Sequence, residues 1–138
     1  MSVQFDSQRI VIFGQGLLYD PYYFVLAGED TRTDYNSVVR AVLGQWAEAI
    51  AQLGSAGDIV FLPFGVYDQC TECLEAKALA ERVILRCVWL DIEGWQIDLH
   101  NLTDFMKQSH NIVTEAPEKF GVFNKLELIA ALRESGAT

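Results

Sequence analysis

The chain has 138 residues, of which 51% are hydrophobic and 21% charged, so its composition is that of a folded globular protein and not of a disordered, collagen-like or coiled-coil chain. This length predicts one domain over residues 1–138, large enough to bury a hydrophobic core without staples. Nineteen acidic against ten basic residues give a net charge of −9, which repels nucleic-acid phosphates and anionic lipid headgroups. We therefore expect neither a nucleic acid nor a membrane as a partner.

The N-terminus and the cysteines predict the compartment. Residues 1–9 are polar and lack the apolar stretch of a secretory signal. The longest apolar runs, such as 83–90, are far shorter than the roughly 20 residues that span a membrane. Cys70, Cys73 and Cys87 are an odd number of cysteines, which fits a reducing compartment better than a disulfide framework. We expect a cytoplasmic protein with free thiols.

The first third of the chain predicts two strands and a helix. Residues 9–13 and 22–27 are short runs of β-branched and aromatic residues, separated by a glycine-containing turn at 14–16. The polar segment 28–36 predicts a loop, and 37–53 predicts a helix because its apolar residues recur on one helical face. These apolar residues are Val39, Val42, Leu43, Trp46, Ile50 and Leu53.

The middle of the chain predicts three strands. Residues 58–64 are rich in β-branched and aromatic side chains, and Pro63 either ends this strand or places it at a sheet edge. The segment 71–82 is ambiguous because 74–81 has strong helix propensity. We predict a strand there, since 83–90 is strongly β-forming and an upstream partner would complete an antiparallel meander.

The last third predicts a hairpin strand and two helices. Residues 91–94 suggest a turn, after which Trp95, Ile97 and Leu99 alternate with polar residues as in a half-buried strand. A short helix is expected over 102–106, followed by an irregular segment up to Lys119. The final helix begins with a capping-box pattern, Asn124 and Glu127. We expect it to bury Leu126, Ile129, Ala130 and Leu132.

The order of these elements predicts the fold class. The strands are mostly separated by turns and not by helices, which favours an α+β protein. We expect one largely antiparallel sheet of about five to six strands, with two to three helices packed on it in a single pair of layers.

The pattern CTEC at residues 70–73 is the sharpest motif in the chain. A C-x-x-C pair can form a reversible disulfide or hold two corners of a zinc site. The remaining candidates, Cys87, His100 and His110, do not provide the second closely spaced pair of a zinc ribbon or finger. Ordinary free thiols are the favoured interpretation, so we expect no metal and no cofactor. A thiol-redox or zinc-binding protein centred on Cys70 and Cys73 is the alternative, and a small enzyme that uses His100 or His110 stays open.

Acidic residues recur in the predicted loops, with aromatic residues among them. Aromatic anchors surrounded by negative charge suit the binding of a basic protein. A solvated acidic surface that only aids solubility is the other interpretation. The predicted partner-binding residues are Tyr67, Asp68, Glu72, Asp91, Glu93 and Trp95.

Three segments carry a resemblance to a known class of proteins. They are DPYYFVLAGED at residues 20–30, FLPF at 61–64 followed by YDQ at 67–69, and DIEGW at 91–95. With the size and acidity of the chain, they resemble the small acidic immunity proteins of bacterial polymorphic-toxin systems. The resemblance implies a cytoplasmic antidote that binds a cognate toxin or effector domain with a basic surface and occludes its active site. We expect stoichiometric inhibition, with no enzymatic chemistry in this chain.

Overall fold

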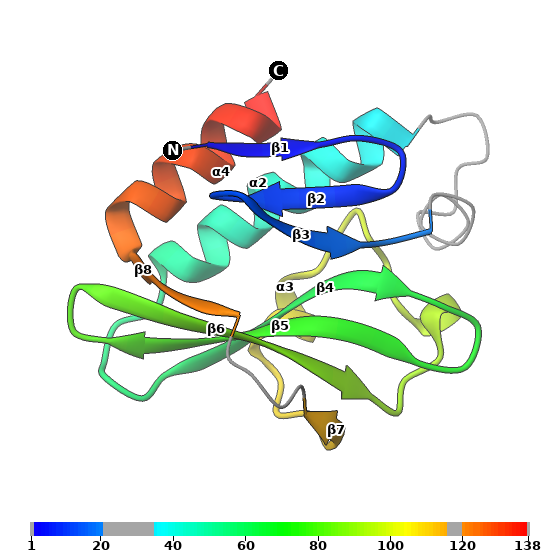
Figure 1. Ribbon diagram of the computed structural model, residues 1–138. Coiled ribbons are helices and arrows are strands. Elements are labelled where there is room, and N and C mark those ends of the chain that lie inside the picture. The colour runs from blue at the N-terminus through cyan, green and yellow to red at the C-terminus, as the bar shows by residue number, and fades with distance from the viewer. Residues whose placement is uncertain (1, 21–34, 116–119, 138) are drawn as a thin grey trace.

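The computed structural model describes residues 2–20, 35–115 and 120–137 (Figure 1). Within these ranges the chain forms strands and helices in the order β1 (Val3–Phe5), β2 (Arg9–Ile12), β3 (Gln15–Leu18), α2 (Tyr35–Ala51), β4 (Ile59–Val66), β5 (Thr71–Leu79), β6 (Arg82–Leu90), the 3-10 turn η1 (Gly94–Gln96), α3 (Thr103–Lys107), β7 (Ile112–Glu115), β8 (Gly121–Asn124) and α4 (Lys125–Ala137). The predicted strand at 22–27 lies outside the described residues.

A small antiparallel sheet contains β1, β2 and β3 in that order. The β2–β3 hairpin turns at Phe13 and Gly14, whose φ angles of 48° and 87° are the positive values that a type I′ turn requires. The strand over 9–13 is therefore confirmed, but Gln15 and Gly16 begin β3 and do not belong to the turn. The strand β1 has no counterpart in the prediction.

The large antiparallel sheet has the order β4-β5-β6-β7, and β8 also pairs with β6. β5 and β6 pair along their whole length, from Thr71 opposite Leu90 to Leu79 opposite Arg82, which confirms the predicted strand at 71–82. β4 is the edge strand, and its register shifts between Pro63 and Gly65. The expectation that Pro63 marks a sheet edge is confirmed.

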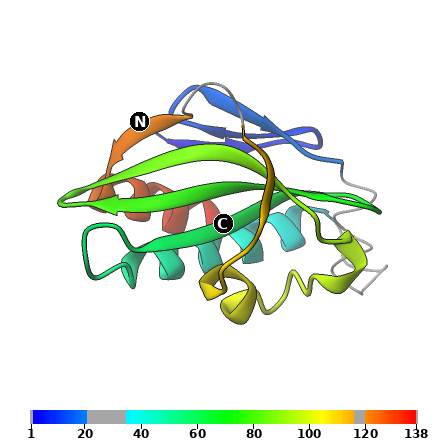
Figure 2. The same cartoon turned by 90° about the horizontal axis from the view of Figure 1, so that it is seen from below.

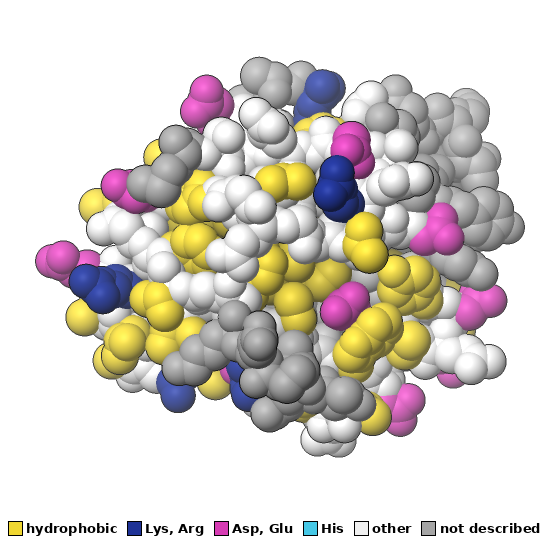
Figure 3. Space-filling view, in the orientation of Figure 1, with side chains coloured by type: hydrophobic (Ala, Val, Ile, Leu, Met, Phe, Trp, Pro, Cys, Tyr) yellow, Lys and Arg dark blue, Asp and Glu magenta, His cyan; other side chains and the backbone are white. Residues whose placement is uncertain are grey.

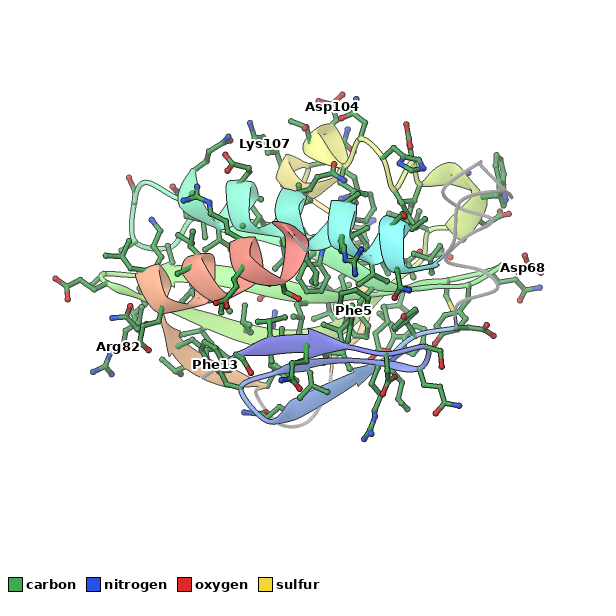
Figure 4. The ribbon with its side chains drawn as sticks, turned by 90° about the horizontal axis from the view of Figure 1, so that it is seen from above. Phe5, Phe13, Asp68, Arg82, Asp104 and Lys107 are labelled. Atoms are coloured by element: carbon green, nitrogen blue, oxygen red, sulfur yellow. The ribbon has the colours of Figure 1, made fainter. Side chains whose placement is uncertain are left out.

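The helices α2 and α4 pack against each other and lie over the large sheet, with the small sheet along the outer side of α4 (Figure 4). All six apolar residues predicted for the helix over 37–53 are buried, although α2 ends at Ala51 and Leu53 lies after it. In α4, Asn124 Oδ1 accepts a hydrogen bond from the Glu127 N–H at 3.0 Å, as expected for a helix cap.

The buried face of α4 differs in part from the prediction. Ile129 and Leu132 are buried, but Leu126 is 76% exposed and Ala130 is also exposed. The inward face is set by Leu128, and residues two positions away along a helix point about 200° from it. Leu126 and Ala130 therefore face outward.

The predicted strand over 95–99 is wrong. Gly94–Gln96 forms the 3-10 turn η1, and the chain then continues without pairing to β6. Ile97 and Leu99 are buried in the core, whereas Trp95 is 69% exposed. The alternation of apolar residues thus reflects a loop packed on the core. β6 pairs instead with β7, which lies in the segment predicted to be irregular up to Lys119, and with β8, for which no strand was predicted.

Both faces of the large sheet are buried in part. One face joins the small sheet, α2 and α4 in the main core, and the other carries a smaller cluster formed by Phe61, Cys73, Val88 and Leu90. Figure 2 shows the chain between α3 and β7 passing across this second face. The α+β class and the antiparallel pairing are confirmed, with the strands divided between two sheets and not gathered in one.

Candidate functional site

Three segments meet at the end of the large sheet where β4 stops. Tyr67 and Asp68 follow β4, Glu72 lies near the start of β5, and residues 91–95 follow β6. The N–H of Gly94 donates a hydrogen bond to the carbonyl oxygen of Tyr67 at 2.7 Å. A Cβ atom at position 94 would lie 2.6 Å from Val66 Cγ1, so only glycine allows this close approach. Gly94 therefore ties the segment after β6 to the β4–β5 turn.

A second hydrogen bond holds the same segment. The side chain of Thr71 is buried, and its hydroxyl donates to the carbonyl oxygen of Ile92 at 2.9 Å. The segment then presents Glu93 and Trp95 to solvent, where the Trp95 indole N–H donates to the Glu93 carboxylate. An exposed tryptophan with an acidic partner is a suitable anchor for another protein.

Tyr67, Glu72 and Trp89 form a cluster on the sheet face that also bears the main core. Glu72 lies directly opposite Trp89 in the β5–β6 register, so the two side chains are on the same face. The rings of Tyr67 and Trp89 are stacked, with centroids 5.9 Å apart and planes inclined by 28°. We call these three residues the ring–carboxylate cluster. Trp89 was not among the predicted site residues.

The cluster is electrostatically negative and partly desolvated. Desolvation raises the pKa of the Glu72 carboxyl group above its ordinary value of 4.5. Desolvation is also the main cause of the raised pKa of Tyr67, with the negative charges of Glu72 and Asp20 adding to it. Within the described parts of the chain, no cation forms an ion pair with Glu72.

The six predicted residues all lie at this end of the sheet, in two groups with exposed carboxylates beside them. Tyr67 and Glu72 belong to the ring–carboxylate cluster, and Glu93 contacts Trp95. Asp68 and Asp91 are exposed. Figure 4 shows Asp68 at the opposite end of the sheet from Arg82, and Figure 3 shows acidic side chains along the side of the front face where β4 ends.

The three cysteines lie in different surroundings. Cys70 is in the turn before β5, Cys73 is buried in the smaller cluster, and Cys87 packs against the main core. Cys70 and Cys73 are three positions apart, and three residues of extended chain span about 10 Å. This span is more than the usual Cα separation of about 4.4–6.8 Å in a disulfide. Burial raises the pKa of all three thiols, that of Cys87 to about 11. Raised values are opposite to those of reactive thiols, so this geometry gives the redox alternative no support.

The two histidines lie apart from the pocket between α2 and α3. His110 Nε2 is hydrogen-bonded to the carbonyl oxygen of Phe105 at 2.7 Å, and its ring packs on Phe61 and Phe105, while His100 is exposed. A pocket of about 280 Å³ between α2 and α3 has neither histidine in its lining. In the described ranges, no three His, Cys, Asp or Glu side chains are grouped as metal ligands.

Comparisons with known proteins assign no family to this chain. No family model, curated protein or solved structure matches this chain. None of the helices within the described ranges has both the length and the hydropathy that crossing a membrane requires. The fold and the site define an α+β protein with an acidic and aromatic surface at one end of its large sheet.

Proposed function

We propose that this protein is a cytoplasmic immunity protein, which binds a cognate toxin or effector domain through the acidic and aromatic end of its large sheet. One observation carries the proposal: six residues selected for their charge and aromaticity, from three separate segments, converge at that end. The protein inhibits by covering the active site of its partner and performs no chemistry itself.

The two kinds of side chain have different roles in this proposal. The exposed carboxylates of Asp68, Asp91 and Glu93 attract a basic surface over long range and orient the encounter. Trp95 and Tyr67 supply rigid contact area at the centre of the interface, where aromatic residues contribute most to affinity.

Capture of the partner tests the proposal. The tagged protein is incubated with lysate of its native cells at low and moderate salt, and co-eluting proteins are identified by mass spectrometry. The double variant Asp91→Asn, Glu93→Gln is compared with Glu127→Gln, Glu134→Gln, which removes the same charge from exposed positions of α4.

We expect one stoichiometric partner with a basic surface, retained less well as salt rises and less well by the variant at the sheet end. The purified partner should have a toxic activity that one equivalent of this protein abolishes. A partner that is retained equally by both double variants, or an activity that persists in the complex, would contradict the proposal.

A further inference from the structure

Gly65 makes the ring–carboxylate cluster compact. It lies opposite Glu72 in the β4–β5 register. A Cβ atom at position 65 would lie 2.9 Å from Glu72 Cβ and 3.1 Å from Tyr67 Cε2. The Tyr67 ring therefore lies over the bare backbone of β4, directly beside the Glu72 side chain. Trp89 flanks Glu72 from the other neighbouring strand.

The cluster has the chemistry of a cation site. The faces of tyrosine and tryptophan rings carry negative electrostatic potential and attract ammonium and guanidinium groups. Here two such rings are stacked on each other beside a half-buried carboxylate. Asp20 adds a further negative charge near Tyr67.

Another carboxylate on β5, that of Glu75, is more deeply buried than Glu72 and is paired with a cation of the chain itself. Glu75 is 92% buried in its side chain and accepts two hydrogen bonds from Arg86 on β6, at 2.6 and 3.1 Å. Glu72 lies three residues earlier on the same strand and, among the described residues, has no such partner. A desolvated carboxylate without a cation is unfavourable, and binding a cation from outside would relieve it.

Resting on the proposed function, we propose that the ring–carboxylate cluster receives an arginine side chain of the partner protein. Arginine fits better than lysine because its planar guanidinium stacks on an aromatic face and donates two parallel N–H groups to a carboxylate. The exposed carboxylates of Asp68, Asp91 and Glu93 favour the approach of such a cation. The partner thus inserts one arginine at Glu72, while Trp95 contacts its surface nearby.

A small arginine probe tests this site without the partner. The full-length protein, labelled with ¹⁵N, is titrated separately with N-acetyl-arginine methylamide, with its lysine analogue and with its citrulline analogue, of which the last has the same shape as the arginine probe and no charge. The three tryptophans give three indole N–H signals, and the buried Trp46 serves as the internal reference. We expect a saturable shift of the Trp89 signal with the arginine probe, a weaker response to the lysine analogue and none to citrulline.

Matched variants separate the site from general attraction. Glu72→Gln keeps the shape of the side chain and should weaken probe binding about tenfold or more, as loss of a charge-assisted hydrogen bond does. Glu127→Gln, on α4, removes the same charge and should leave binding unchanged. Tyr67→Leu, which removes a stacking face, should weaken binding several-fold and gives a second result if the first variant does not fold.

The outcomes distinguish this inference from the proposed function. No shift at Trp89, or equal binding by Glu72→Gln and the parent chain, overturns the arginine site even where a partner is captured. A specific shift at Trp89 together with failed capture leaves the site standing and removes the immunity function.

Discussion

The Glu72 carboxylate is half-buried on β5, and desolvation raises its pKa above 4.5 in the folded protein. A carboxyl group whose pKa is raised by folding is destabilising in its charged form. This unfavourable contribution is present at neutral pH and disappears as the pH falls toward the ordinary value of 4.5.

Replacing Glu72 should therefore stabilise the free protein. We expect Glu72→Gln to raise the unfolding free energy at neutral pH by about 0.5 kcal/mol, with a smaller gain as the pH is lowered. Urea unfolding of both proteins at several pH values measures the difference. A variant that is less stable at neutral pH, or a gain that grows on acidification, would show that the carboxylate is stabilising as it stands.

Within the part of the chain that the structure describes, the buried carboxylate of Glu75 is paired with a cation, Arg86, unlike that of Glu72. Arg86→Leu leaves the Glu75 carboxylate buried without this cation, so we expect a loss of about 3 kcal/mol in unfolding free energy. The double variant Glu75→Leu, Arg86→Leu should recover most of it because no unpaired charge stays buried.

An exposed pair provides the control. Arg133 lies 3.1 Å from Glu48, and both side chains are more than half exposed. Arg133→Leu should change the unfolding free energy by less than about 0.5 kcal/mol. Equal losses for Arg86→Leu and Arg133→Leu would show that burial does not set the strength of these pairs.

At this scale, the sequence shows which of the predicted site residues are close along the chain, but not which side chains the fold brings beside them. Tyr67 and Asp68 are adjacent in the chain, and Glu93 and Trp95 are separated only by Gly94. The sequence alone therefore shows that the members of each pair are close together. Trp89 joins Glu72 only through the register of β5 and β6, which depends on packing along both strands. No local pattern shows that Glu72 would lie beside a stacked pair of aromatic rings.

Among the elements, the segment after β6 is held at the β4–β5 turn by two hydrogen bonds, and one of them requires the close approach of Gly94. Gly94→Ala places a methyl group against Val66 and the Tyr67 backbone, so we expect a loss of about 1–3 kcal/mol in unfolding free energy. The segment 91–95 should also separate from the β4–β5 turn, and partner binding should weaken accordingly. Thermal unfolding and backbone NMR shifts of residues 66–72 measure the two effects.

Gly44→Ala is the matched control. A Cβ atom at Gly44, within α2, meets no atom within 4 Å, and alanine is favoured over glycine in a helix. This variant should be more stable by about 0.5–1 kcal/mol. Loss of stability in both variants would mean that contacts other than those at position 94 are responsible.

A long element whose apolar residues recur at regular spacing could be predicted from the sequence, whereas the short strands β7 and β8 could not. The apolar face of 37–53 specifies α2 because six residues recur on one helical side. β5 forms despite the helix propensity of 74–81, since strands pair with it on both edges. β7 and β8 have four residues each, too few for a clear alternation, and their pairing with β6 comes from distant parts of the chain.

For the whole molecule, the distribution of charge predicts how fast a partner associates. The net charge is −9, and Asp68, Asp91 and Glu93 lie at the same end of the large sheet. Asp91→Asn with Glu93→Gln should slow association several-fold at low salt and flatten its dependence on ionic strength. Glu127→Gln with Glu134→Gln should have a smaller effect because α4 is not in the proposed interface. Association rates that are unchanged across ionic strength in the parent protein would contradict steering by charge.

The α+β class followed from the order of elements, but the division into two sheets did not. Strands β1–β3 and β4–β8 are all paired antiparallel, and among the described residues no strand of one group pairs with a strand of the other. Such separation depends on contacts between residues far apart in the chain, which one sequence does not display.

The position of β6 between β5 and the later strands β7 and β8 matters while the chain is being synthesised. One edge of β6 pairs with β5, its neighbour in the chain, whereas the other edge is paired by β7 and β8, which come later in the chain. Until residues up to Asn124 have emerged, β6 presents open backbone groups along a run of Val, Ile, Leu and Trp side chains, the kind of edge that recruits other strands. We therefore expect translation that stalls between Leu90 and Ile112 to yield an aggregation-prone fragment, and completion of the C-terminal third to remove this open edge.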